Sequence, residues 1–90
     1  MPLFTLGNIV ATPGALEALG RSGQSPGEFL TVHARGEWGE LDAHDTAANK
    51  AALRDGSRIL SQYSTRCGDV IWVLTEADRA SACILLPSEY

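Results

Sequence analysis

Two short groups of charged and titratable side chains are the places where this sequence could do chemistry. The first places His44 between Asp42 and Asp45, and the second is the charged run at 76–79. Carboxylates beside a histidine are common metal ligands, and a carboxylate pair beside an arginine can transfer protons. Each group is therefore a candidate chemical site.

The spacing of the first group does not suit a metal ion. Side chains separated by one to three positions at the start of a helix do not converge on one ion. The chain has two histidines and two cysteines, and none of them stands at a metal-ligand spacing. We expect Cys67 in a turn and Cys83 inside a strand, as a surface thiol and a small core residue. A disulfide between them is geometrically possible, but nothing in the sequence implies it. We predict no metal and no cofactor.

The second group has an ordinary structural explanation. Glu76, Asp78 and Arg79 lie between two apolar runs, where a hairpin turn needs polar residues in any case. No nucleophile, histidine or glycine-rich loop accompanies them, and no serine has the G-x-S-x-G context. Phosphate-binding and dinucleotide-binding fingerprints are missing from the sequence. We therefore predict no catalytic residues and a protein that is not an enzyme.

The elements that must position these groups are clearest in the C-terminal third. Three apolar runs follow one another there, at 59–63, 70–74 and 82–86. Short polar turns separate them. Three β-prone runs with tight connections are typical of an antiparallel meander.

The N-terminal segment predicts a strand followed by a helix. Residues 6–11 form a short β-prone run, so we expect a brief strand there. Thr12 can cap a helix and Pro13 suits its first position. These signals predict a helix over 13–19 that ends at Gly20.

Two more helices are expected before the meander. Ser25 and Glu28 have the spacing of a capping box, which predicts a helix that ends near Gly36. A third helix is predicted from 43 to 54, with Asp42 as its N-cap and a glycine after its last turn.

Together these elements predict an α+β fold in one domain spanning residues 1–90. In it, the N-terminal short strand and two or three short helices pack on one face of the C-terminal three-stranded antiparallel meander. A chain of 90 residues buries roughly 60–65% of the surface that its unfolded form exposes, which suits one covered sheet. The partner of the N-terminal strand stays open.

Charge and hydropathy narrow the classes of partner. The net charge is −4 and basic residues are scattered singly, so direct nucleic-acid binding is not expected. A helix-turn-helix DNA reader is disfavoured further, because the second helix offers few base-edge donors beyond His33 and Arg35. No apolar run approaches the ~18–20 residues that span a bilayer, and residues 1–4 lack a charged leader. We expect a cytoplasmic protein without membrane contact.

An acidic surface favours a protein partner with a basic surface. Acidic residues outnumber basic ones most strongly between residues 37 and 55. Trp38 lies at the start of this segment, where an aromatic side chain either closes over the core or anchors a partner. The candidate partner-binding residues come from this segment and from the charged turn: Glu37, Trp38, Glu40, Asp42, Asp45, Glu76 and Asp78.

Five motifs stand out along the chain: W-G-E-L-D at 38–42, R-I-L-S-Q-Y at 58–63, I-W at 71–72, T-E-A-D-R at 75–79 and I-L-L-P-S-E-Y at 84–90. They resemble a family of short uncharacterised bacterial proteins carried on plasmids, integrative elements and prophages. Some of these are labelled as subunits of type I restriction enzymes. The resemblance implies a mobile-element setting rather than a mechanism, and 90 residues are too few for a methyltransferase domain.

In that setting, a small acidic protein is expected to bind and inhibit a defence nuclease, as anti-CRISPR and anti-restriction proteins do. Its carboxylates would occupy basic residues that otherwise meet phosphate. One alternative is an accessory or toxin–antitoxin-like module that regulates an element-encoded partner, since the element order loosely resembles that of small ribosome-dependent RNase toxins. Another is a self-associating structural module, a homodimer paired through an exposed edge of the meander.

Overall fold

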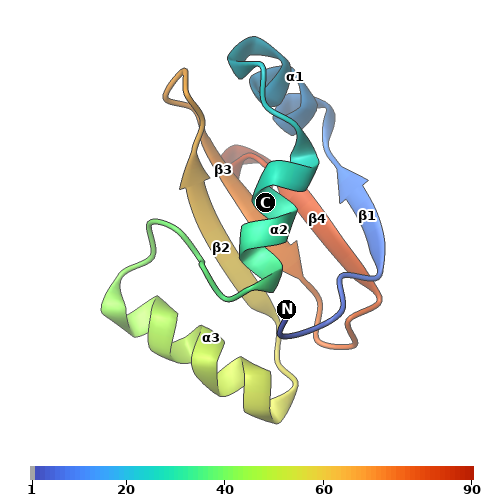
Figure 1. Ribbon diagram of the computed structural model, residues 1–90, viewed down its shortest axis with the longest axis vertical. Helices are drawn as coiled ribbons and strands as arrows, with labels where there is room; N and C mark the ends of the chain where they lie inside the picture. The colour runs from blue at the N-terminus through green and yellow to red at the C-terminus, as the bar shows by residue number, and fades with distance from the viewer. Residues whose placement is uncertain (1) are drawn as a thin grey trace.

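The computed structural model describes residues 2–90, so Met1 lies outside it. Within that range three α-helices accompany a four-stranded sheet, which confirms the α+β class (Figure 1). The elements follow in the order β1 (Asn8–Ala11), α1 (Pro13–Ser22), α2 (Pro26–Ala34), α3 (Ala43–Asp55), β2 (Ile59–Ser64), β3 (Val70–Thr75), β4 (Ser81–Leu85) and a 3₁₀ turn, η1 (Pro87–Glu89).

The strands lie in the order β1-β4-β3-β2. β2, β3 and β4 form the predicted antiparallel meander. β1 extends the sheet by pairing parallel to β4, with Val10 opposite Cys83. The expected three-stranded sheet is therefore corrected to a mixed sheet of four strands. The local pattern of residues 6–11 predicts a strand, but it holds no information about a partner that lies seventy residues along the chain.

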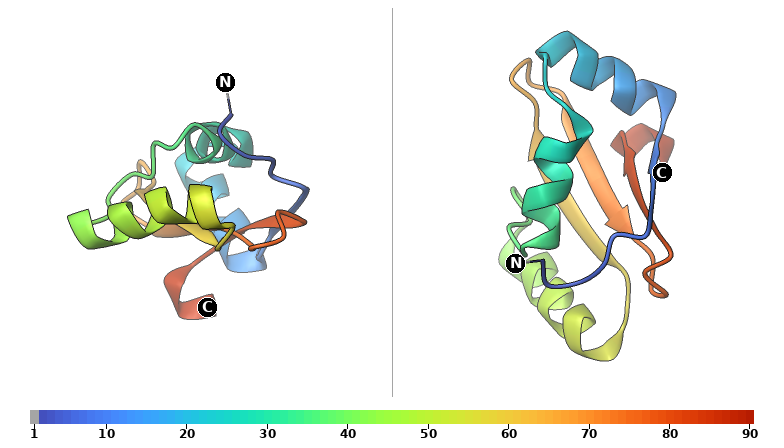
Figure 2. Two further views of the ribbon diagram at one scale, coloured as in Figure 1. Left: turned by 90° about the horizontal axis from the view of Figure 1, so that it is seen from below. Right: turned by 45° about the vertical axis from the view of Figure 1, so that its right-hand side comes forward.

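One face of the sheet bears the core. Alternate residues of a strand point to the same face, and Ile71, Val73 and Ile84 are fully buried there. Leu19 of α1 and Phe29 of α2 pack against them. In Figure 1, α2 lies over this face, α1 crosses the end near the β2–β3 turn, and α3 lies beside β2. In Figure 2, the C-terminal turn and α2 are on opposite sides of the sheet.

Helix α1 is longer than predicted. Thr12 caps it as expected, but the helix runs through Gly20 and ends at Ser22. A glycine inside a helix costs about 1 kcal/mol relative to alanine, and burial of Leu19 and Ser22 offsets that cost. The actual stop is Gly23, which has a left-handed φ of 68°.

The first turn of α2 also differs from the prediction. The Ser25 side chain makes no capping hydrogen bond, so the predicted capping box is wrong. The Glu28 carboxylate instead accepts a hydrogen bond from the side-chain amide of Gln24 at 2.7 Å. The start of α3 is confirmed, because Asp42 Oδ1 accepts the Asp45 N–H at 2.8 Å.

Candidate functional site

Three acidic side chains gather at the N-terminal end of α3. Glu40 lies in the preceding loop, Asp42 is the N-cap and Asp45 is in the first turn, and all three are exposed. The Ser64 hydroxyl donates to Glu40 at 2.7 Å. Within residues 2–90, none of the ion pairs involves these three carboxylates. This group, called the α3 acidic end below, therefore presents three carboxylates that form no ion pair with a described basic side chain.

The other acidic residues of the prediction lie elsewhere. Glu37 forms an ion pair with Arg35, whose Nε lies 3.1 Å from its carboxylate. Glu76 and Asp78 are on the β3–β4 turn, near the C-terminal end of α3 (Figure 1). The 13 residues of α3 correspond to a helix of about 20 Å. The predicted residues therefore do not form one patch.

Arg79 gives the β3–β4 turn a structural role. Its guanidinium donates to the carbonyls of Ala52, at 3.1 Å, and Ser57, at 2.7 Å. The guanidinium is a second donor to the Ala52 carbonyl, which also accepts the Gly56 N–H at 2.9 Å, and a cation here suits the negative end of the helix. Asp78 accepts the Ala80 N–H at 2.9 Å, as aspartate often does in turns. The charged turn thus holds α3 against the sheet.

Trp38 is 6% exposed and packs with Ala52 and Ile59 in a second part of the core. The next residue, Gly39, has a φ of 75°, and a Cβ there would lie 2.1 Å from the Gln62 carbonyl oxygen. Only glycine lets the loop approach β2 this closely. Of the two interpretations of Trp38, the structure places its side chain over the core, so it is unavailable as an exposed anchor.

A buried histidine forms the polar cluster that the sequence did not reveal. His33 of α2 is fully buried; its Nδ1 hydrogen-bonds the Ser61 hydroxyl, and its Nε2 lies 2.9 Å from the Thr75 hydroxyl. Phe4 packs edge-on against the ring. Burial lowers the pKa of His33 to about 4, so the imidazole is neutral at pH 7. Because no substrate can reach the Ser61 hydroxyl, this serine–histidine pair acts as a structural link.

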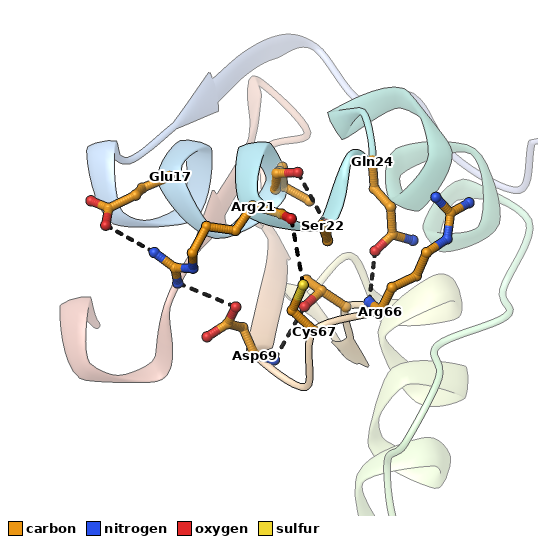
Figure 3. Close-up of polar contacts among 9 residues, drawn as sticks. Glu17, Arg21, Ser22, Gln24, Arg66, Cys67 and Asp69 are labelled. Atoms are coloured by element: carbon orange, nitrogen blue, oxygen red, sulfur yellow. Dashed lines mark hydrogen bonds and ion pairs between the residues drawn. The ribbon is translucent and has the colours of Figure 1, made fainter.

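A second polar cluster joins α1 to the β2–β3 turn (Figure 3). Arg21 forms an ion pair with Asp69 at 3.2 Å, and the Cys67 thiol donates to the Arg21 carbonyl at 3.4 Å. The Arg66 N–H donates to the Gln24 side chain at 2.9 Å. Both cysteines of the chain are free thiols. These exposed contacts position the turn and converge on no common point where a ligand could sit.

The part of the chain from residue 2 to residue 90 holds no group of three or more histidine, cysteine, aspartate or glutamate side chains placed for a metal ion. The three α-helices described there are all too short or too polar to cross a bilayer.

A comparison of the chain with protein-family models, curated proteins and solved structures finds no match. The resemblance to mobile-element proteins therefore stays a prediction.

Proposed function

We propose that this protein is a non-enzymatic inhibitor from a mobile genetic element that binds a bacterial defence nuclease complex of the CRISPR or restriction kind. The observation that supports this function is the α3 acidic end: three exposed carboxylates without an ion-pair partner, on a protein of net charge −4. Nuclease channels present lysine and arginine toward phosphate. Carboxylates can occupy the same basic residues and compete with nucleic acid for them.

The surroundings of the α3 acidic end favour binding because they hold its carboxylates in place. The loop backbone is tied to β2, with the Glu40 N–H donating to the Gln62 carbonyl at 2.7 Å. The Gln62 N–H donates in turn to the Trp38 carbonyl at 3.1 Å. Trp38 is buried beneath this loop, and Asp42 is engaged as a helix cap. A rigid surface loses less conformational entropy on binding.

The experiment that tests this proposal compares two matched charge reversals. E40K/D45K reverses two carboxylates of the α3 acidic end and keeps Asp42 as the helix cap. E17K/E28K makes the same change in net charge on α1 and α2, and Glu28 matches Asp45 as a first-turn acid. Each variant replaces one first-turn acid, and E17K also removes the exposed Glu17–Arg21 ion pair, which contributes little to stability. A difference in binding therefore reports on the location of the charge.

Each tagged protein is used to capture partners from nuclease-treated bacterial lysate, with mass spectrometry of the eluate. We expect the parent and E17K/E28K to capture a subunit of a defence nuclease in stoichiometric amount, with release at high salt. E40K/D45K should capture less by about tenfold or more, because like charges facing each other cost several kcal/mol. Equal capture by E40K/D45K would show that another surface binds. Capture of an element-encoded partner alone would favour the accessory module instead.

A further inference from the structure

The free edge of the sheet is β1, and the meander itself has no open edge within residues 2–90. At β2, the Asn49 side chain bonds both the N–H and the C=O of Leu60, at 3.2 and 2.7 Å. Gln62 bonds the loop before α3. β4 is covered by β1. Beyond β1, Figures 1 and 2 show no further element of the chain.

The backbone of β1 offers unused hydrogen-bonding groups at this edge. The N–H groups of Asn8 and Thr12 donate toward β4, at 2.9 and 3.0 Å. Bonding directions alternate along a strand, so the N–H and C=O groups of Ile9 and Ala11 point the other way. These groups can pair with a strand from another chain.

The side chains of residues 2–16, which include this edge, are uncharged and mostly apolar, and the nearest carboxylate that contacts them is Glu89, which accepts a hydrogen bond from the Thr12 hydroxyl. Ile9 and Val10 lie on opposite faces of the sheet and are 48% and 50% exposed. No charged side chain occurs from Pro2 to Leu16. Most of the large exposed apolar residues of the described chain belong to this segment: Leu3, Ile9, Val10 and Leu16. Natural sheet edges are usually protected by lysine, proline or a bulge, and β1 contains neither lysine nor proline.

A groove of about 820 Å³ borders the same strand. Its lining is mostly apolar, with Ile9 from β1 and Leu30 and Ala34 from α2, and Arg35 is the one charged residue in it. The groove gives side chains on the helical face of an added strand an apolar surface to contact. Both the backbone and the side chains of β1 thus fit an extended, mostly apolar segment.

We propose that β1 pairs with β1 of a second copy of this chain, antiparallel about a two-fold axis perpendicular to the sheet. The distribution of charge on the chain favours a second copy as the partner at this edge. Two copies of net charge −4 repel each other, and the uncharged segment is where they can approach, whereas a basic partner is attracted to the α3 acidic end. A two-fold axis also requires a self-complementary surface, which an uncharged strand edge provides.

The outward groups determine the register of this pairing. Ile9 of each copy exchanges two backbone hydrogen bonds with Ala11 of the other copy. Val10 then faces Val10 of the second copy at the axis, where the opposed side chains of a non-hydrogen-bonded pair are closest. The sheet becomes continuous across the dimer. Both α3 acidic ends remain free, because α3 lies beside β2 at the far edge of each sheet.

Sedimentation of the parent and three variants tests the pairing. We expect the parent to sediment with the mass of two chains at micromolar concentration. Val10→Lys places a charge at the axis, and Ala11→Pro removes an outward N–H without breaking a bond to β4. Both variants should sediment as one chain. Leu16→Lys is the control, because Leu16 is 51% exposed and belongs to α1 rather than to the pairing strand, and this variant should behave as the parent does.

Amide hydrogen exchange identifies the edge itself. In the parent, protection of the Ile9 and Ala11 amides should rise with protein concentration, while the Asn8 and Thr12 amides stay protected at every concentration. Protection of the Asn8 and Thr12 amides shows that β1 remains folded. The concentration dependence in the parent therefore tests the pairing of β1 even where a variant misfolds. A parent that stays at single-chain mass, or an Ala11→Pro variant that keeps two-chain mass, would overturn the proposal.

Discussion

His33 illustrates how one side chain stabilises this fold without taking part in catalysis. Both of its ring nitrogens contact hydroxyl groups, one on β2 and one on β3. The ring therefore ties α2 to two neighbouring strands in the middle of the core. Because it is fully buried, its charged form is disfavoured in the folded protein.

This burial predicts a pH dependence of stability. The unfolded chain binds a proton at His33 near pH 6.5, and the folded chain does so only near pH 4. Between these values protons favour the unfolded state, so the free energy of unfolding should fall as the pH is lowered through this window. The difference in pKa corresponds to about 3 kcal/mol. Above pH 6.5 the contribution is fully present and constant.

Denaturant titrations of the parent and of His33→Gln between pH 7 and pH 4 measure this effect. Glutamine keeps hydrogen-bonding groups but cannot titrate, so the variant should show a much smaller loss. If His33→Gln does not fold, an NMR titration of the His33 ring in the parent gives its pKa directly. A ring that titrates near 6.5 in the folded protein would contradict the assignment.

The role of a residue can be predicted from the sequence where it depends on near neighbours along the chain. Asp42 caps α3 through a backbone group three residues away, so its role could be predicted. His33 follows Phe29 at helical spacing, which indicates the buried face of α2. Its partners Ser61 and Thr75 could not be predicted, because they meet the ring only through strand register and helix placement.

At the scale of elements, the Asn49 side chain joins Arg79 in fixing the position of α3. Asn49 is 5% exposed. Its side chain accepts the Leu60 N–H and donates to the Leu60 C=O, so it makes the two hydrogen bonds that a neighbouring strand would otherwise make with Leu60. It closes the edge of β2 and holds the helix that bears the α3 acidic end. The sequence shows an asparagine in a helix that is otherwise rich in alanine, but not the strand that it contacts.

Asn49→Ala should therefore destabilise the protein by about 2 kcal/mol, because two backbone groups of Leu60 lose their partner. Lys50→Ala is the control, since Lys50 is the exposed neighbour on the same helix and such substitutions stay within about 0.5 kcal/mol. Chemical denaturation of both variants provides the comparison. Equal stability of the two would mean that Asn49 does not hold α3 in place.

Local sequence signals predict most helices and strands. They fail where an element depends on contacts with distant parts of the chain. Apolar runs identified the three strands of the meander, because tight turns force neighbours in sequence to pair in space. The parallel partner of β1 lies far along the chain, so no local signal could indicate it. The sequence predicts a helix end at Gly20, but tertiary burial of Leu19 and Ser22 overrides this weak local preference.

For the whole molecule, the two edges of the sheet have opposite characters. The β2 edge is closed by Asn49 and by the loop before α3, and it carries the exposed acidic group. The β1 edge is open, apolar and uncharged. The proposed partner binding at one edge and the proposed self-pairing at the other are therefore compatible, and we expect a variant at one edge to leave binding at the other edge unchanged.

The measurement that tests the central claim most directly is phage plating on cells that carry the captured defence system. Cells express the parent, E40K/D45K or E17K/E28K, and a targeted phage is plated on each. We predict that the parent and E17K/E28K raise the plating efficiency toward that of cells without the system, and that E40K/D45K leaves it low. A parent that leaves plating unchanged, or an E40K/D45K variant that protects as well as the parent, would contradict an inhibitor that acts through the α3 acidic end.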